Sequence, residues 1–176
     1  MPTDPRALIL FGTNALLLFL TLQVNSALAN WSLYLVLLGP MIVLPALYMR
    51  HSSFFVCTLA TGLWVDAGLP APFGLFTISF LCIGTLLFMA RSRFRTEHNY
   101  HPILLAHVIN FFAILLLMLA MGWGLFTSSG FWMHALITLL FSHLALLVIA
   151  PWFFNLERLL FEICRVETEP EDLPLS

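Results

Sequence analysis

The stretch ILLAHVINFFAILLLMLAMGWGLF at residues 103–126 decides the fold, because it runs for 24 residues without a charged side chain. A helix that crosses a bilayer needs about 20 mostly apolar residues. Only helices and closed β-barrels pair all of their backbone hydrogen-bonding groups inside lipid. A barrel strand alternates apolar and polar residues, whereas the apolar residues here follow one another directly, as from Phe111 to Met121. The stretch therefore predicts a transmembrane helix.

The composition of the whole chain extends this interpretation. Of its 176 residues, 61% are hydrophobic and 9% are charged, whereas a soluble domain carries about 25% charged residues. The lipid bilayer is therefore the expected solvent. All seven basic residues are arginines, and they are too widely spread to make the basic patch or stripe that binds nucleic acid.

Six segments of the chain are apolar enough to be membrane spans, and they cover residues 7–24, 31–49, 53–67, 73–90, 103–126 and 131–154. We therefore predict an all-α integral membrane domain of six transmembrane helices at residues 1–155. Pro40 and Pro45 lie within the second segment. Proline removes a helical hydrogen bond, so we expect this helix to be kinked or interrupted.

The tail at residues 156–176 has a different composition. Leu156, Leu159, Leu160 and Ile163 recur at helical spacing, which predicts an amphipathic helix lying in the cytoplasmic interface. The last ten residues, 167–176, combine four acidic residues with two prolines. This composition cannot bury a core, so we expect that part of the tail to be disordered.

The arginines predict the orientation of the bundle. They precede the first segment, separate the second from the third and the fourth from the fifth, and follow the sixth. Every arginine therefore falls on the same side of a six-helix bundle, and the positive-inside rule makes that side the cytoplasm, together with both termini. The seven residues are Arg6, Arg50, Arg91, Arg93, Arg95, Arg158 and Arg165.

One alternative concerns the first segment. Arg6, an apolar run and the sequence Ala27-Leu28-Ala29 together resemble a signal peptide with its cleavage site. However, the run is longer than the usual apolar core of about 7–15 residues, and it contains Asn14. We predict an uncleaved first helix, with cleavage as the alternative.

Asp66 is the residue that most suggests a site. It is the one acidic residue assigned to the outer half, 16 residues after Arg50. That separation is about 24 Å along a helix, less than the roughly 30 Å hydrocarbon thickness. A carboxylate at membrane depth usually faces protein or water, so Asp66 is expected to anchor a loop or a partner, or to be a solvated cap of the next turn. Thr58 and Gly62 share its helix face, and small residues let helices approach closely.

The other polar residues predict neither catalysis nor a cofactor. No two of the six histidines have the four-residue spacing of a helical zinc site. His134, Thr138 and Ser142 form a stripe on the sixth segment, which predicts hydrogen bonds between helices. Glu157 and Glu162 lie in the tail, where we expect them to be solvated. No metal, cofactor or enzyme activity is therefore expected.

Residues 44–87, LPALYMRHSSFFVCTLATGLWVDAGLPAPFGLFTISFLCIGTLL, resemble the central part of the rod shape-determining protein MreD family. That family tends to have a proline in an early helix, a GL-x-x-D helix, and a Gly-Leu pair at the start of the next helix. The layout of the whole chain and its length are also similar. The residues in the matching places are Pro45, Gly62, Leu63, Asp66, Gly74 and Leu75.

This resemblance implies a non-catalytic scaffold in the inner membrane of a bacterium. It would bind an MreC-like partner through helix faces and the Asp66 loop, and help to couple MreB to the peptidoglycan synthases of cell elongation. The resemblance also implies a fold similar to the substrate-binding subunits of energy-coupling vitamin transporters. A small-molecule-binding subunit of such a transporter is therefore the alternative function.

Overall fold

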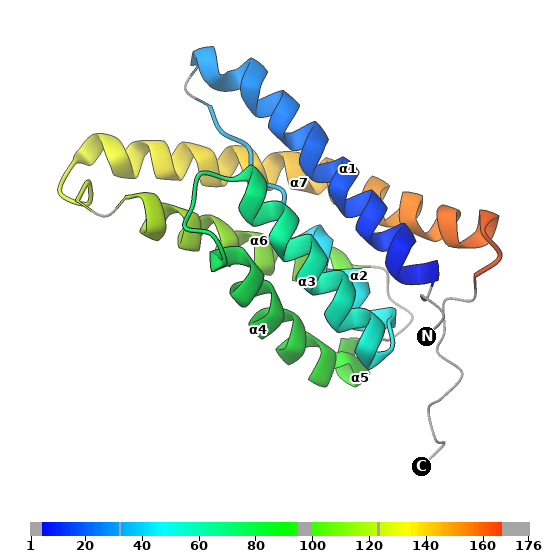
Figure 1. Ribbon diagram of the computed structural model, residues 1–176. Coiled ribbons are helices and arrows are strands. Elements are labelled where there is room, and N and C mark those ends of the chain that lie inside the picture. The colour runs from blue at the N-terminus through cyan, green and yellow to red at the C-terminus, as the bar shows by residue number, and fades with distance from the viewer. Residues whose placement is uncertain (1–4, 32, 95–99, 123, 167–176) are drawn as a thin grey trace.

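The computed structural model describes residues 5–31, 33–94, 100–122 and 124–166, and every regular element in these ranges is a helix (Figure 1). Three helices are long and apolar enough to cross a membrane, namely α1 with η1, α6 and α7. They indicate a membrane protein. The elements are α1 (Pro5–Leu28), η1 (Ala29–Trp31), α2 (Pro40–Tyr48), α3 (His51–Gly68), α4 (Leu75–Met89), α5 (Arg91–Phe94), α6 (Tyr100–Met121) and α7 (Ser129–Ile163).

Five of the six predicted segments are helices close to their predicted positions, as α1, α3, α4, α6 and α7. The last differs at its end, because α7 continues without a break through the predicted tail boundary to Ile163. Arg95 and the predicted disordered stretch 167–176 lie outside the described residues.

The second predicted segment, at 31–49, is not a continuous helix, and its interruption agrees with what Pro40 and Pro45 predicted. Residues 33–38 have no regular structure, and only Pro40–Tyr48 is helical. Proline has no N–H group and cannot bond the carbonyl four residues earlier. Val36 lies in the irregular segment before Pro40, the first residue of α2, so its carbonyl has no helical donor, and Asn110 Nδ2 donates to it at 2.9 Å.

Pro45 creates the same deficit one turn further on. The Met41 carbonyl lies four residues before Pro45, and Asn14 Nδ2 of α1 donates to it at 2.9 Å. An asparagine from another helix thus supplies the missing donor to each of these two carbonyls. These bonds explain how a broken helix remains in an apolar interior, where an unpaired polar group is costly.

Side chains also pair other backbone groups of the segment at residues 33–38. Asn25 of α1 both accepts from the Leu35 N–H at 2.7 Å and donates to the Leu35 carbonyl at 2.8 Å. Asn110 Oδ1 accepts from the Leu38 N–H at 2.9 Å and from the Gly39 N–H at 3.2 Å. Ser142 of α7 accepts from the Val36 N–H at 3.0 Å. Three helices thereby hold one non-helical segment.

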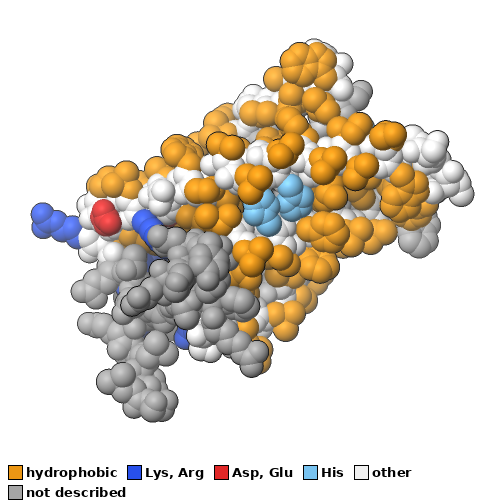
Figure 2. Space-filling model, turned by 180° about the vertical axis from the view of Figure 1, so that it is seen from behind, with side chains coloured by type: hydrophobic (Ala, Val, Ile, Leu, Met, Phe, Trp, Pro, Cys, Tyr) orange, Lys and Arg blue, Asp and Glu red, His pale blue; other side chains and the backbone are white. Residues whose placement is uncertain are grey.

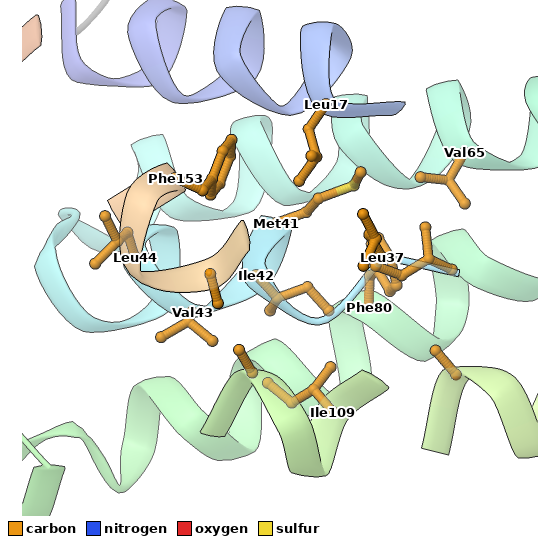
Figure 3. Close-up of a cluster of buried hydrophobic side chains, with 14 of the residues drawn as sticks. Leu17, Leu37, Met41, Ile42, Val43, Leu44, Val65, Phe80, Ile109 and Phe153 are labelled. Atoms are coloured by element: carbon orange, nitrogen blue, oxygen red, sulfur yellow. The ribbon is translucent and has the colours of Figure 1, made fainter. Parts of the chain in front are cut away.

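Helix α2 lies at the centre of the bundle and contacts α1, α3, α4, α6 and α7. Residues 40–47 are all buried. Figure 3 shows side chains of other helices converging on α2. They include Leu17 of α1, Val65 of α3, Phe80 of α4, Ile109 of α6 and Phe153 of α7. The core is therefore built around the shortest of these helices, although that helix cannot span a membrane by itself.

Replacing Asn110 with Ala should destabilise the bundle by about 3 kcal/mol or more, because three buried backbone groups lose their partner at about 1–3 kcal/mol each. Thermal unfolding in detergent measures the effect. Thr85→Ala is the matched control, because the Thr85 hydroxyl bonds only the Leu81 carbonyl of its own helix. Equal melting temperatures for the two variants would contradict the role of Asn110.

Candidate functional site

Asp66 is buried, with 4% of its surface exposed, and it caps helix α4 from the neighbouring helix α3. Its Oδ1 accepts from the Phe76 N–H at 2.9 Å, and its Oδ2 accepts from the Thr77 N–H at 3.0 Å and from the Thr77 hydroxyl. These N–H groups belong to the first turn of α4, where a helix has no internal acceptors. The negative carboxylate also faces the positive end of the helix dipole.

The cap fixes the connection between α3 and α4. Residues 69–74 leave α3, and Gly74 turns the chain into α4 with a φ of +94°, a conformation that favours glycine. Asp66 at one end of this connection holds Phe76 and Thr77 at the other. Asp66 thus anchors a loop and caps the next turn, as the two interpretations predicted between them, but it is buried and not solvated.

Gly62 lies one turn before Asp66 and brings α3 against α4. A Cβ atom at Gly62 would lie 2.6 Å from the Thr77 Cα, so only glycine permits this approach. Thr58 is buried on the same helix, and its hydroxyl has no hydrogen-bond partner among the described residues. The structure therefore groups Gly62, Asp66 and Gly74 at the start of α4, while Pro45 lies apart in α2.

A groove of about 710 Å³ runs between α4 and α6. Its walls extend from Phe76 to Leu87 on α4, with Ala90 just after that helix, and from Leu105 to Leu119 on α6. Ser79 and Cys82 are the polar members of the lining, and the Ser79 hydroxyl already donates to the Leu75 carbonyl at 2.7 Å. Such a groove suits apolar side chains or acyl chains, and it offers little to orient a polar solute.

Two histidines pair on another face of the molecule. His107 Nδ1 of α6 lies 2.9 Å from His143 Nδ1 of α7, and the two rings stack. Figure 2 shows neighbouring His side chains on a largely hydrophobic face. The described residues contain no group of three or more potential metal ligands. The geometry therefore supports a hydrogen bond between α6 and α7, consistent with interhelical polar pairing in membranes.

The predicted polar stripe on the last helix divides in the structure. Ser142 and Thr138 are buried, and Ser142 bonds the Val36 N–H, but His134 is exposed. The expectation that Glu157 is solvated is wrong, because its side chain is completely buried. The tail helix turns Glu157 and Phe161 towards the bundle, and it leaves Leu159 and Ile163 exposed.

The sequence did not reveal which residues hold the irregular segment before α2. Asn25 and Asn110 lie within or beside apolar runs, and the cost of a polar side chain in lipid does predict that each has a partner. Their partners lie 10 to 74 residues away in the sequence, so spacing alone cannot identify them.

Comparison with protein-family models, with curated proteins and with solved structures finds no match to this chain.

Replacing Asp66 with Ala should lower stability by about 2 kcal/mol, because loss of a helix cap costs about 0.5–2 kcal/mol and the buried N–H groups become unpaired. Asp66→Asn keeps one acceptor oxygen and should lose less. Chemical unfolding in mixed micelles ranks the two variants. If Asp66→Ala is as stable as the native chain, the cap does not hold α4.

Replacing Gly62 with Ala should separate α3 from α4 and lower the melting temperature, because its Cβ would collide with the Thr77 backbone. We expect a loss of about 1–3 kcal/mol, as for other overpacked sites. Gly12→Ala is the control, since a Cβ at Gly12 meets no atom within 4 Å. A neutral Gly62→Ala variant would show that the close approach is not required.

Proposed function

We propose that this chain is a non-catalytic scaffold in the inner membrane of a bacterium and that it crosses the membrane six times. The three long helices α1, α6 and α7 account for three crossings, and α3 and α4 for two more. The sixth is the broken segment. Its six residues without regular structure and the nine of α2 would reach about 33 Å if the six were fully extended in line with the helix, enough for a hydrocarbon core of about 30 Å.

An arrangement with both termini in the cytoplasm accounts for the distribution of arginines. One contact supports it directly, because Arg91 Nη1 at the start of α5 donates to the Met49 carbonyl at 3.2 Å. That bond joins the turn between α2 and α3 to the connection after α4, and both are assigned to the cytoplasmic side. The charged side chains visible in Figure 2 also gather towards one end of the molecule.

The groove between α4 and α6 is the observation that carries the scaffold proposal. Each wall covers about 15 residues, or roughly 21 Å of helix, so the groove could line about two thirds of a partner helix that crosses a hydrocarbon core of about 30 Å. The lining is almost wholly apolar and consists mostly of Leu, Ile, Val and Phe, so it would hold a helix in lipid by van der Waals packing. The proposed occupant is the single span of an MreC-like partner, and the complex would connect MreB with the elongation peptidoglycan synthases.

The rival function is that of a small-molecule-binding subunit of an energy-coupling transporter. It would place a solute near Asp66 and the broken second segment. There the Asp66 oxygens are engaged by α4, and Asn25, Asn110 and Ser142 are engaged by residues 35–39. These groups are committed to the protein itself, which favours the scaffold.

Replacing Leu86 with Trp should fill the groove and reduce recovery of the partner by about tenfold, equivalent to roughly 1.4 kcal/mol. Leu86 lines the groove and is 67% exposed. Affinity purification of the tagged chain from native membranes, with mass spectrometry of the co-purifying proteins, measures the recovery. Val148→Trp is the control, because Val148 is 76% exposed on α7, outside the groove lining.

The identity of the recovered proteins separates the two functions. An MreC-like protein with elongation synthases supports the scaffold. ATPase subunits together with a coupling membrane protein would replace it with the transporter function. Equal recovery of an MreC-like partner by both Trp variants would keep the scaffold but remove the groove as its binding surface.

A further inference from the structure

Glu157 is a completely buried carboxyl group with little to stabilise a charge. It projects from the last third of α7, where Thr13 Oγ1 of α1 lies 2.9 Å from its Oε1. Its second oxygen, Oε2, has no hydrogen-bond partner among the described residues. Asp66, the other buried acid, is surrounded by three donors. The two carboxyl groups therefore occupy opposite kinds of environment.

The hydrogen atoms available at Thr13 indicate the protonation state of Glu157. The Thr13 hydroxyl lies 3.0 Å from the Leu10 carbonyl as well as 2.9 Å from Glu157. A hydroxyl has one hydrogen, and a carbonyl only accepts. If Thr13 donates to Leu10, its bond to Glu157 needs a hydrogen that Glu157 provides. A neutral acid satisfies both contacts at once, whereas a carboxylate would be a poorly compensated buried charge.

We propose that Glu157 is a proton-binding site, and that its bound proton fastens the last turns of α7 to α1. The chain of donors runs from the Glu157 carboxyl to the Thr13 hydroxyl and on to the Leu10 carbonyl. The ligand is a proton and not a metal ion, because hard cations take six or more oxygen ligands, whereas the described oxygens here are one carboxyl and one hydroxyl. This proposal concerns the chain alone and does not depend on the scaffold function.

Other titratable groups on the surrounding helices do not pair with Glu157 Oε2. Cys57 of α3 lies close enough for an electrostatic interaction with Glu157, and its own hydrogen bond goes to Thr61. His107 of α6 pairs with His143, which precedes Glu157 by 14 residues on α7. The remaining charged or titratable residues on α1, α2, α3 and α7 are Arg6, Tyr48, His51, Asp66, His134, Arg158 and Glu162, and Arg50 immediately precedes α3.

Because of the position of Glu157 in α7, its proton determines whether the end of this helix stays in contact with α1. Pro151 interrupts the hydrogen bonding of α7 six residues earlier, and such a site is a common point of helix bending. Beyond it, Phe153, Phe154 and Phe161 are buried with Glu157. When the carboxyl loses its proton, the charge favours water and the segment after Pro151 can swing away from α1. The contact is thus held at low and neutral pH and is released as the pH rises.

Infrared spectroscopy of the purified full-length chain in lipid nanodiscs tests the proton directly. At neutral pH we expect a carbonyl-stretch band from a protonated carboxyl group. It should disappear in Glu157→Gln and persist in Glu162→Gln, the exposed acid on the same helix. Thr13→Val should move the band to higher frequency, because the acid loses its acceptor. A native chain without this band at neutral pH would overturn the proposal, even if no variant folds.

Hydrogen–deuterium exchange tests the release of the helix end. After correction for intrinsic rates, amides at residues 155–163 of the native chain should exchange roughly tenfold faster once the band has titrated away at high pH. Glu157→Gln cannot lose a proton there, so its protection should not change over the same range. An identical rise in exchange for the native chain and Glu157→Gln would refute the coupling.

Discussion

The rest of the structure depends on one constraint, which is that a non-helical segment in an apolar interior must have every backbone polar group paired. Side chains from α1, α6 and α7 pair several backbone groups of residues 33–38. The carbonyls of Val36, before α2, and of Met41, four residues before Pro45, each accept from an asparagine. The same bonds that pay this cost fix where three long helices lie around α2, so the short central helix organises the longer ones.

Buried acids follow a related rule, in which the number of donors decides the form of the group. Asp66 receives two backbone N–H groups and one hydroxyl at the positive end of α4, and such a setting favours a carboxylate. Glu157 meets one hydroxyl that is shared with a carbonyl, and this setting favours the neutral acid. Asp66 therefore joins α3 to α4 by accepting hydrogen bonds. In the proposal, Glu157 joins α7 to α1 through the proton that it binds.

Features that depend on the length of an apolar run could be predicted from the sequence. Long uncharged runs located five helices, and the prolines of the second segment indicated where a helix would be interrupted. Asp66 was also identified, because an acid at membrane depth requires a partner. Two kinds of feature could not be predicted from the sequence. The hydrogen bonds of Asn25 and Asn110 join distant residues, and the burial of Glu157 depends on how α7 rotates against α1, whereas the leucine spacing suggested another buried face.

The polar side chains lie in the interior of the bundle and the groove between α4 and α6 is apolar, and this distribution relates the fold to its proposed role. Asparagine, serine and aspartate side chains of the interior are committed to holding the chain's own backbone. The groove between α4 and α6 is left with an almost wholly apolar lining. In lipid, such a surface gains no hydrophobic driving force for binding, so its selectivity must come from shape and close packing. The proposed scaffold would therefore recognise the shape of a neighbouring helix, whereas the proposed alternative would require polar groups to orient a solute.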